Sequence, residues 1–239
     1  MIVGMNGSSI AGALGLMGGL GVPATLHYYR NLVSALEEGG REAEIVIVHA
    51  NMRRAIELVQ AGKLDALAEY LASLIGRMAA AGATLAVIPA ITPHICAAQL
   101  AAVSPIPFVN ILDAIADEIR RRGLKRVALF GTRFTIESHL FGRLEDVEVV
   151  SPKPHEIDTI HATYLQLASG EGDPDEHRRL LRALAKELCR RESLDAILLA
   201  GTDLSLVFKE SNTDFPHLDC AQAHLEAIAR AVLQARAAG

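Results

Sequence analysis

The stretch TLAVIPAITPH, residues 84–94, decides the fold of this sequence. Its first six residues form a short apolar run that ends in proline, a pattern typical of a fully buried strand in a parallel sheet. In the preceding segment, residues 64–78, large apolar residues recur at intervals of three and four, so we expect an amphipathic helix with one face on that sheet. The sequence thus predicts a helix, a strand and a threonine-containing turn in succession.

The same unit recurs in the second half of the chain. Leucines at 180, 181, 184 and 188 predict another amphipathic helix, residues 196–200 another buried strand, and Gly201-Thr202-Asp203 the turn after it. Further strands are expected at residues 13–17, 44–48, 107–109, 126–130 and 147–150, and a last helix over Leu225, Ile228 and Val232. This alternation of strands and helices indicates an α/β fold with parallel sheets flanked by helices.

The repeat also predicts two lobes of the same topology. We assign residues 13–113 with 219–239 to the first lobe and residues 114–218 to the second, and we treat residues 1–12 as an N-terminal extension. Ligands of open parallel sheets bind beyond the carboxyl ends of the strands. The turns that follow strands are therefore the places to look for functional side chains.

Composition and charge exclude several classes of function. The chain has 239 residues, a formal net charge of −5 and dispersed Lys and Arg, so it offers no basic surface for nucleic acid. Its first ten residues resemble neither a signal peptide nor a membrane span, and three cysteines without metal-ligand spacing favour a reducing compartment. We expect a cytoplasmic protein with no membrane partner and no nucleic-acid partner.

A glycine-rich turn follows the first expected strand. Gly18, Gly19 and Gly21 let the backbone approach a ligand closely, and Pro23 suits the first turn of a helix. The spacing matches neither a dinucleotide fingerprint nor a phosphate-binding loop with its lysine. An anion cradle that includes Gly18 and Gly19 is one interpretation, and a tight strand-to-helix turn without a ligand is the other.

Thr92 and His94 follow the strand of the opening stretch. The Thr92-Pro93 pair predicts a helix N-cap and a first helical position, and N–H groups at a helix start can bind a carboxylate. His94 is expected in the first turn, where the helix dipole favours a neutral ring that accepts a proton. Capping explains Thr92 without a ligand, and a histidine in this place is more often structural than a base.

Three further groups of candidates follow the strands of the second half. Thr202 and Asp203 follow residues 196–200, and Asp203 is either an acid or base or a cap. Thr132 and Thr135 follow residues 126–130 and are candidates for anion binding, together with Arg133, which is otherwise a solvated charge. His161 lies on an expected helix, with Tyr164 one turn later.

From residue 13 onward the chain resembles the aspartate/glutamate racemases, a family of cofactor-independent amino-acid racemases. The resemblance rests on the glycine turn with His27-Tyr28-Tyr29-Arg30, on residues 87–94, on Gly131–Thr135, on His161 and on residues 198–204. It implies two Rossmann-like lobes related by a pseudo-two-fold, with substrate bound in a cleft between them. In that family two facing thiols remove and return the α-proton, and no pyridoxal phosphate is used.

The sequence departs from the family at the catalytic positions. The family pattern Pro-Cys-Asn-Thr-x-His places its first thiol at Ala90, and Gly-Cys-Thr-Glu places its second at Gly201. Alanine and glycine side chains cannot transfer a proton, so the two-thiol reaction does not carry over. Cys96 and Cys220 are expected to be small buried hydrophobic residues rather than substitutes.

Three functions remain open from the sequence. The first is an enzyme, of isomerase, decarboxylase, lyase or cyclase type, that binds a small carboxylate through Gly18, Gly19, Thr92, Thr132, Thr135 and Thr202. His94, His161 and Asp203 would carry its protons. The second is a non-catalytic carboxylate-binding protein, and the third is a racemase with a non-cysteine base. We expect no cofactor, no metal site and a homodimer.

Overall fold

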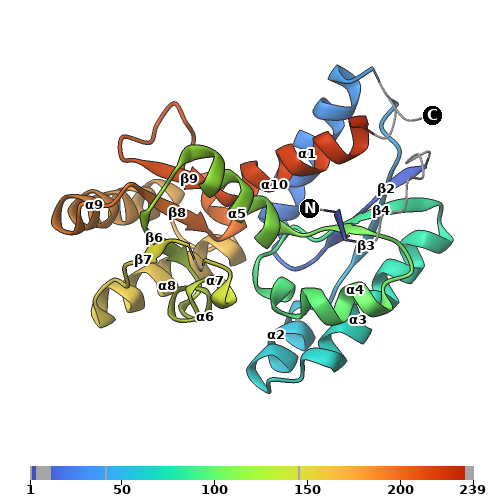
Figure 1. Cartoon of the computed structure of the whole chain (residues 1–239), viewed down its shortest axis with the longest axis horizontal. Helices are drawn as coiled ribbons and strands as arrows, with labels where there is room; N and C mark the ends of the chain where they lie inside the picture. The colour runs from blue at the N-terminus through green and yellow to red at the C-terminus, as the bar shows by residue number, and fades with distance from the viewer. Residues whose placement is uncertain (1, 4–11, 41, 145, 235–239) are drawn as a thin grey trace. The chain divides into compact units, whose positions relative to one another are not determined.

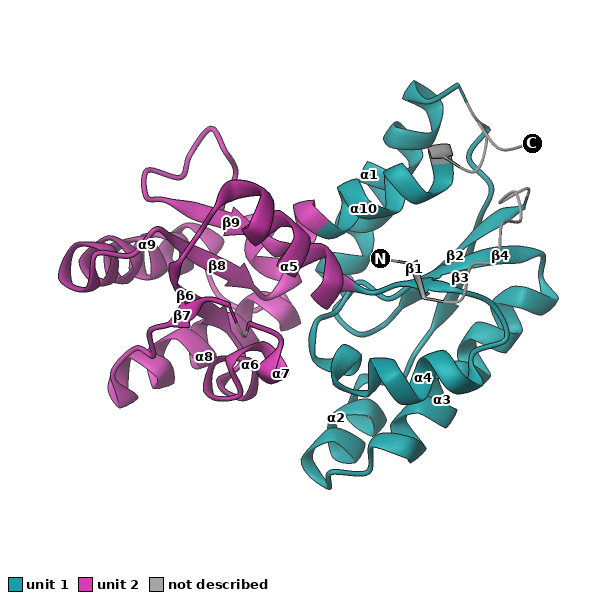
Figure 2. Cartoon of the chain, viewed as in Figure 1, with its two compact units in different colours: residues 1–110, 224–239 teal, residues 111–223 magenta. Residues whose placement is uncertain are grey.

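The computed structural model describes residues 2–3, 12–40, 42–144 and 146–234. The chain forms two compact units, one of residues 1–110 with 224–239 and the other of residues 111–223 (Figure 2). Each unit has its own sheet and its own set of helices (Figure 1). The predicted α/β fold is confirmed.

Unit 1 is built on a five-stranded sheet in the order β1-β5-β4-β2-β3. Its strands are β1 (Ile2–Val3), β2 (Ala13–Gly18), β3 (Ile45–His49), β4 (Ala83–Val87) and β5 (Phe108–Val109). All neighbours pair in parallel except β1, which runs antiparallel to β5. The helices are α1 (Val22–Glu38), α2 (Met52–Gln60), α3 (Leu64–Ala80), the 3-10 helix η1 (Thr92–Cys96), α4 (Ala97–Val103) and most of α10 (Cys220–Gln234).

Unit 2 is built on a four-stranded parallel sheet in the order β7-β6-β8-β9. Its strands are β6 (Arg126–Gly131), β7 (Glu148–Val149), β8 (Ala196–Ala200) and β9 (His217–Asp219). Its helices are α5 (Ile111–Arg122), α6 (Arg133–Glu137), the short turn α7 (His139–Gly142), α8 (Pro154–Ser169), α9 (Pro174–Glu192) and the 3-10 helix η2 (Thr202–Leu206).

The two sheets share one topology. When the parallel strands of each unit are numbered along the chain, both sheets have the order 2-1-3-4. In this order the chain leaves the first strand toward one edge of the sheet and leaves the third strand toward the opposite edge. The first and third strands therefore form the switch point at which open α/β sheets bind ligands. The switch point lies between β2 and β4 in unit 1 and between β6 and β8 in unit 2.

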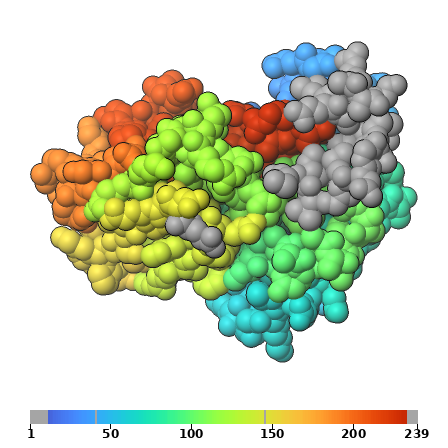
Figure 3. Space-filling view, in the orientation of Figure 1, coloured from blue at the N-terminus to red at the C-terminus, as the bar shows by residue number. Residues whose placement is uncertain are grey.

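The cores follow the apolar periodicity. The inward face of α3 is fully buried at Leu67, Leu71, Ile75 and Met78, as predicted, and α3 and α4 lie side by side (Figures 1 and 3). On α9, Leu181 and Leu188 are buried, whereas Leu180 is 46% exposed. Leu180 was therefore wrongly assigned to the buried face, because it stands one position, or 100°, from Leu181 around the helix.

Two strands were not expected. Ile2 and Val3, within the predicted N-terminal extension, pair with Val109 and Phe108, while residues 4–11 of that extension lie outside the described residues. The strand β9 adds His217–Asp219 to the edge of β8. Both strands have three residues or fewer, too few to show a periodic pattern in the sequence.

An ion pair between a buried carboxylate and a partly buried guanidinium joins the start of α8 to the end of α9. Glu156, only 5% exposed, accepts hydrogen bonds from Arg191 at 2.8 and 2.9 Å and from the backbone N–H of Lys153 at 2.7 Å. The Arg191 guanidinium lowers the pKa of the Glu156 carboxyl below its ordinary 4.5. The stabilisation is therefore complete above about pH 4.5 and is lost as the pH falls through the lower value of the folded state.

We predict that Glu156→Gln lowers the free energy of unfolding at pH 7 by about 1.5–3 kcal/mol, because charged hydrogen bonds are lost in a buried place. The difference from the wild type should shrink as the pH is lowered toward 3 in urea-unfolding experiments. As the matched control, Glu187→Gln removes an exposed partner of Arg190 on α9 and should change the stability by no more than about 0.5 kcal/mol. Equal losses at both positions would contradict the assignment.

Candidate functional site

The predicted site residues of unit 1 follow the two strands of its switch point. Gly18 is the last residue of β2 and pairs with His49, the last residue of β3, while Thr92 and His94 follow β4 in η1. β2 and β4 are hydrogen-bonded neighbours. The glycine turn and the η1 turn therefore leave the same edge of one sheet.

The glycine turn is packed too tightly for a side chain. A Cβ at Gly19 would lie 2.4 Å from the carbonyl oxygen of Ala50 and 2.7 Å from Nε2 of His49, and Gly19 has a φ of +84°. Glycine is thus required by both space and backbone conformation. The helix α1 begins directly afterwards with Pro23 in its first turn, as predicted. His49, exposed beside this turn, was not singled out from the sequence.

Thr92 does not cap a helix. The cap position of η1 is Ile91, which has helical backbone angles and makes no side-chain cap hydrogen bond. The prediction of an N-cap at Thr92 was wrong, because the chain enters helical geometry one residue earlier than the Thr-Pro pattern indicates. Pro93 takes a position in the first turn, as predicted.

His94 is buried beside Ala90. The ring is 1% exposed, and its Nδ1–H donates to the carbonyl oxygen of Ala90 at 2.8 Å. A carbonyl oxygen only accepts, so this bond fixes the tautomer of the neutral ring and leaves the lone pair on Nε2. An imidazole in this state can act as a base through Nε2.

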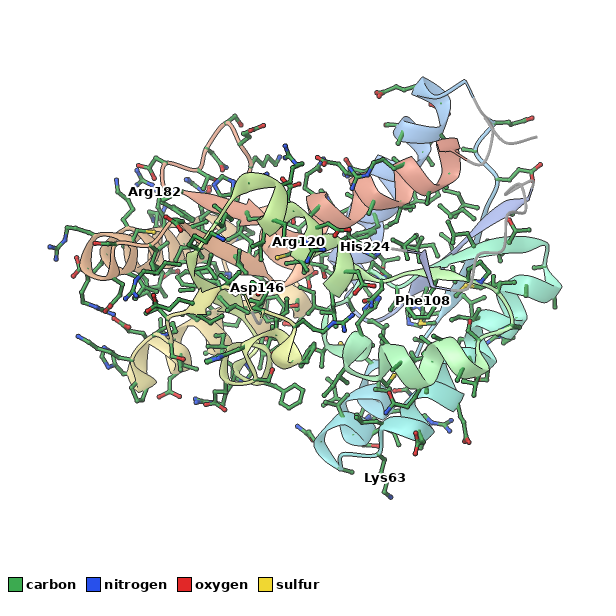
Figure 4. The ribbon with its side chains drawn as sticks, viewed as in Figure 1. Lys63, Phe108, Arg120, Asp146, Arg182 and His224 are labelled. Carbon is green, nitrogen blue, oxygen red and sulfur yellow. The ribbon has the colours of Figure 1, made fainter. Side chains whose placement is uncertain are left out.

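A second buried histidine packs against His94. His224 of α10 is fully buried, and its ring centroid lies 6.0 Å from that of His94. Its Nε2–H donates to the Val109 carbonyl oxygen at 3.0 Å, and its Nδ1 lies 3.1 Å from the hydroxyl of Tyr28, which donates to it. Figure 4 shows His224 on α10 and Phe108, the residue before Val109, on β5.

His224 is a structural support rather than a proton carrier. Burial, reinforced by the neighbouring His94, lowers the pKa of His224 to about 3, so the ring is neutral at physiological pH. Its two ring nitrogens are engaged by Tyr28 and by Val109. The sequence offered one signal, a histidine on the apolar face that carries Ile228 and Val232, which is the usual sign of a core histidine.

In unit 2 the backbone pairs Gly131 with Ala200, so the turns after β6 and β8 begin side by side. Thr132 caps α6 by accepting the N–H of Thr135 at 3.1 Å, and the two hydroxyl oxygens lie 2.8 Å apart. Both threonines thus have structural roles in addition to any ligand contact.

His161 of α8 lies against the turn after β6. The backbone N–H of Arg133 donates to its Nδ1 at 3.2 Å, which leaves the proton of the neutral ring on Nε2. Partial burial, together with the Arg133 charge, lowers the pKa of His161 below 6.5. The Arg133 guanidinium itself pairs with Glu137 at 3.0 Å and with Asp158.

Asp203 is buried after β8. It is 1% exposed, and the hydroxyl of Tyr164 donates to its Oδ2 at 3.3 Å. Tyr164 stands one turn after His161 on α8, as expected, but its contact with Asp203 was not predicted. Such a contact between residues 39 positions apart has no signature in the local sequence.

The cysteines have no reactive environment. Cys96 and Cys220 are fully buried, as predicted. Burial raises the pKa of Cys96 to about 12 and that of Cys220 well above 9. Thiols in such surroundings do not form the thiolate that catalysis requires.

The part of the chain that the structure describes contains no cluster of three or more His, Cys, Asp or Glu side chains that could hold a metal ion. None of its helices is both long enough and apolar enough to cross a membrane.

Two sheets whose parallel strands have the order 2-1-3-4, each with polar side chains after its switch-point strands, define a two-unit α/β protein. Residues 17–228 match the family model described as Asp/Glu/Hydantoin racemase, so the chain belongs to this family. The resemblance noted from the sequence is thereby confirmed.

Solved structures share this fold. A Yersinia pestis protein, provisionally described as an Asp/Glu racemase, has a TM-score of 0.77 at 26% identity, over 93% of this chain and 99% of its own. An aspartate racemase homologue from Pyrococcus horikoshii has a TM-score of 0.75 at 24% identity, over 92% and 98%. The glutamate racemase of Thermus thermophilus, in complex with β-chloro-D-alanine, has a TM-score of 0.63 at 20% identity, over 97% and 84%.

We predict that Tyr28→Phe lowers the free energy of unfolding by about 1–3 kcal/mol, because Nδ1 of the buried His224 loses its donor. Urea unfolding at pH 7 measures this difference. Tyr29→Phe is the matched control, since Tyr29 is the next residue of α1 and is 42% exposed, and it should cost no more than about 0.5 kcal/mol. A Tyr28→Phe protein as stable as the wild type would show that the bond contributes nothing.

Proposed function

We propose that this protein binds a small carboxylate at the carboxyl ends of its switch-point strands and catalyses a cysteine-independent acid/base reaction. The reaction is of the isomerase, decarboxylase, lyase or cyclase type. The observation that carries the proposal is the state of His94, a buried imidazole whose Nδ1–H is held by Ala90, so that Nε2 has the lone pair. His94 thus offers unit 1 a base on the same turn as Ala90, the position at which the family pattern has a cysteine.

The binding part of the proposal rests on the residues of the switch points. Gly18 and Gly19 carry no side chain at the end of β2, and Thr92, Thr132, Thr135 and Thr202 carry hydroxyls, a group that donates to carboxylate oxygens. The relative from Thermus thermophilus binds β-chloro-D-alanine, an α-amino carboxylate, which supports this class of ligand. A homodimer in the cytoplasm remains the expected setting.

The two-thiol reaction of the family is not part of the proposal. Ala90 and Gly201 carry no group that moves a proton, and the raised pKa values of Cys96 and Cys220 oppose a substitute thiolate. The remaining proton carriers are His94 in unit 1 and His161 and Asp203 in unit 2. Each is embedded in hydrogen bonds that fix its orientation.

A non-catalytic carboxylate-binding protein is the second candidate. It is favoured by the hydrogen bonds of unit 2, where Nδ1 of His161 is engaged by Arg133 and Asp203 is engaged by Tyr164. Calorimetry of a carboxylate panel, with mass spectrometry of the same mixtures, separates the two functions. Binding without a product supports the second candidate, and turnover of a bound ligand excludes it.

We predict that His94→Gln lowers kcat on a carboxylate substrate identified in that panel by at least about 100-fold, the usual contribution of a general base. Glutamine can still donate to the Ala90 carbonyl oxygen but cannot carry a proton. Because His94 is buried against Phe108 and His224, some loss of stability is expected, so kcat is compared at a temperature at which the variant is shown to be folded. The control is His155→Gln, an exposed histidine of α8 that should retain full activity. Full activity of the His94→Gln protein would remove His94 from the mechanism.

We further predict no racemisation of aspartate or glutamate, since no pair of thiols is available at residues 90 and 201. The measurement is proton NMR of D- and L-aspartate and D- and L-glutamate in heavy water with the enzyme. Exchange at Cα with inversion would instead establish a racemase that uses a non-cysteine base. Exchange with retention of configuration would fit a reaction from one side, with a single base.

A further inference from the structure

The backbone conformation at position 201 does not require glycine. Gly201 has φ −149° and ψ 119°, an extended conformation that every residue type adopts readily. This distinguishes it from Gly19, whose positive φ requires glycine. The reason for the missing side chain must therefore lie in the surroundings of residue 201.

The ring of Tyr164 occupies the space that a side chain at 201 would need. A Cβ built on Gly201 would lie 2.3 Å from Cε2 of Tyr164, 2.8 Å from Cδ2 and 2.9 Å from Cζ. Nonbonded carbon atoms approach favourably only to about 3.5–4.0 Å. Even alanine at 201 thus requires the ring to move.

The ring is held in this place by Asp203. The hydroxyl of Tyr164 donates to Oδ2 of Asp203 at 3.3 Å, and Asp203 is almost completely buried. Burial, and then the Asp203 charge, raises the pKa of Tyr164 well above 10, so the hydroxyl keeps its proton and remains a donor. Moving the ring to admit a side chain at 201 would take a donor away from a buried carboxyl group.

We propose that Tyr164 is the specificity-determining residue of unit 2: its ring takes the side-chain space of residue 201, and its hydroxyl orients Asp203 at the end of β8. A ligand at this switch point then meets an aromatic ring and a carboxyl group instead of a side chain of residue 201. Gly201 and Tyr164 form a coupled pair, so the identity of one constrains the other. The specificity role rests on the proposed function, whereas the steric coupling does not.

A double-mutant cycle tests the coupling. Gly201→Ala is made in the wild type and in the Tyr164→Ala and Tyr164→Phe proteins, and the melting temperature of each is measured. We expect Gly201→Ala to lower the melting temperature by about 2–12 °C in the wild type, as overpacking does in a domain of this size. The loss should persist with Tyr164→Phe, which keeps the ring, and disappear with Tyr164→Ala.

Gly76→Ala is the matched control for the cycle. Gly76 lies in α3, and the nearest atom to a Cβ there is 4.0 Å away, so the same chemical change meets no obstacle. Its melting temperature should equal or exceed that of the wild type, because alanine favours helix. The coupling is overturned if Gly201→Ala has the same effect in the wild-type and Tyr164→Ala proteins.

Calorimetry with D- and L-glutamate and D- and L-phenylalanine tests the specificity role. Tyr164→Ala removes the ring and should change the ratio of affinities for the small and the aromatic amino acid by about tenfold or more. Uniform weakening of all four would reduce Tyr164 to a structural residue and overturn the role. If the wild type binds none of these amino acids, both the specificity role and the binding of these carboxylates are rejected. The double-mutant cycle still measures the steric coupling between Gly201 and the Tyr164 ring, because it depends only on melting temperatures.

Discussion

The order of strands in each sheet is the constraint on which the candidate site depends. In an order of 2-1-3-4 the connections that leave the first and third strands go to opposite sides, so the carboxyl ends of these strands are not covered by their own crossover helices. In unit 1 the candidate ligand-binding and proton-carrying residues follow β2 or β4, whereas Tyr28 and His224, which support His94, lie on helices. In unit 2 the candidates follow β6 or β8, or contact the turns after these strands from α8. The topology thus selects where polar groups can meet a ligand before any particular side chain is considered.

The side chains at these strand ends are fixed rather than loose. In unit 1 the backbone carbonyls of Ala90 and Val109 determine which nitrogen of His94 and which of His224 carries a proton. In unit 2 an N–H group does the same for His161. Backbone groups have known polarity, so each contact assigns a definite protonation pattern to its histidine without reference to a substrate. Preorganisation of this kind suits proton transfer, and it suits selective binding equally well.

Much of the fold could be predicted from the sequence because buried parallel strands are apolar throughout. The runs at 84–89 and 196–200 contain the strands β4 and β8, apart from Ala83 at the start of β4. The strands β1 and β9 have too few residues to form a pattern, and they exist because a neighbouring edge offers partners. The N-cap at Thr92 was wrong because local propensity could not reveal that helical geometry begins at Ile91. His49 and the contact of Tyr164 with Asp203 depend on residues far apart in the chain, which spacing alone does not reveal. His224 had a local signal in its place on the apolar face of α10, but its partners Tyr28 and Val109 are distant in sequence.

The bond from Tyr28 to His224 spans 196 positions, and it closes a unit whose residues come from both ends of the chain. Unit 2, residues 111–223, is continuous in the sequence, whereas unit 1 needs residues on both sides of it. Unit 2 can therefore fold from a single stretch of chain, as domains generally fold as units. The packing around His94 is incomplete without His224 of α10, so the two stretches of unit 1 must find each other across the 113 residues of unit 2.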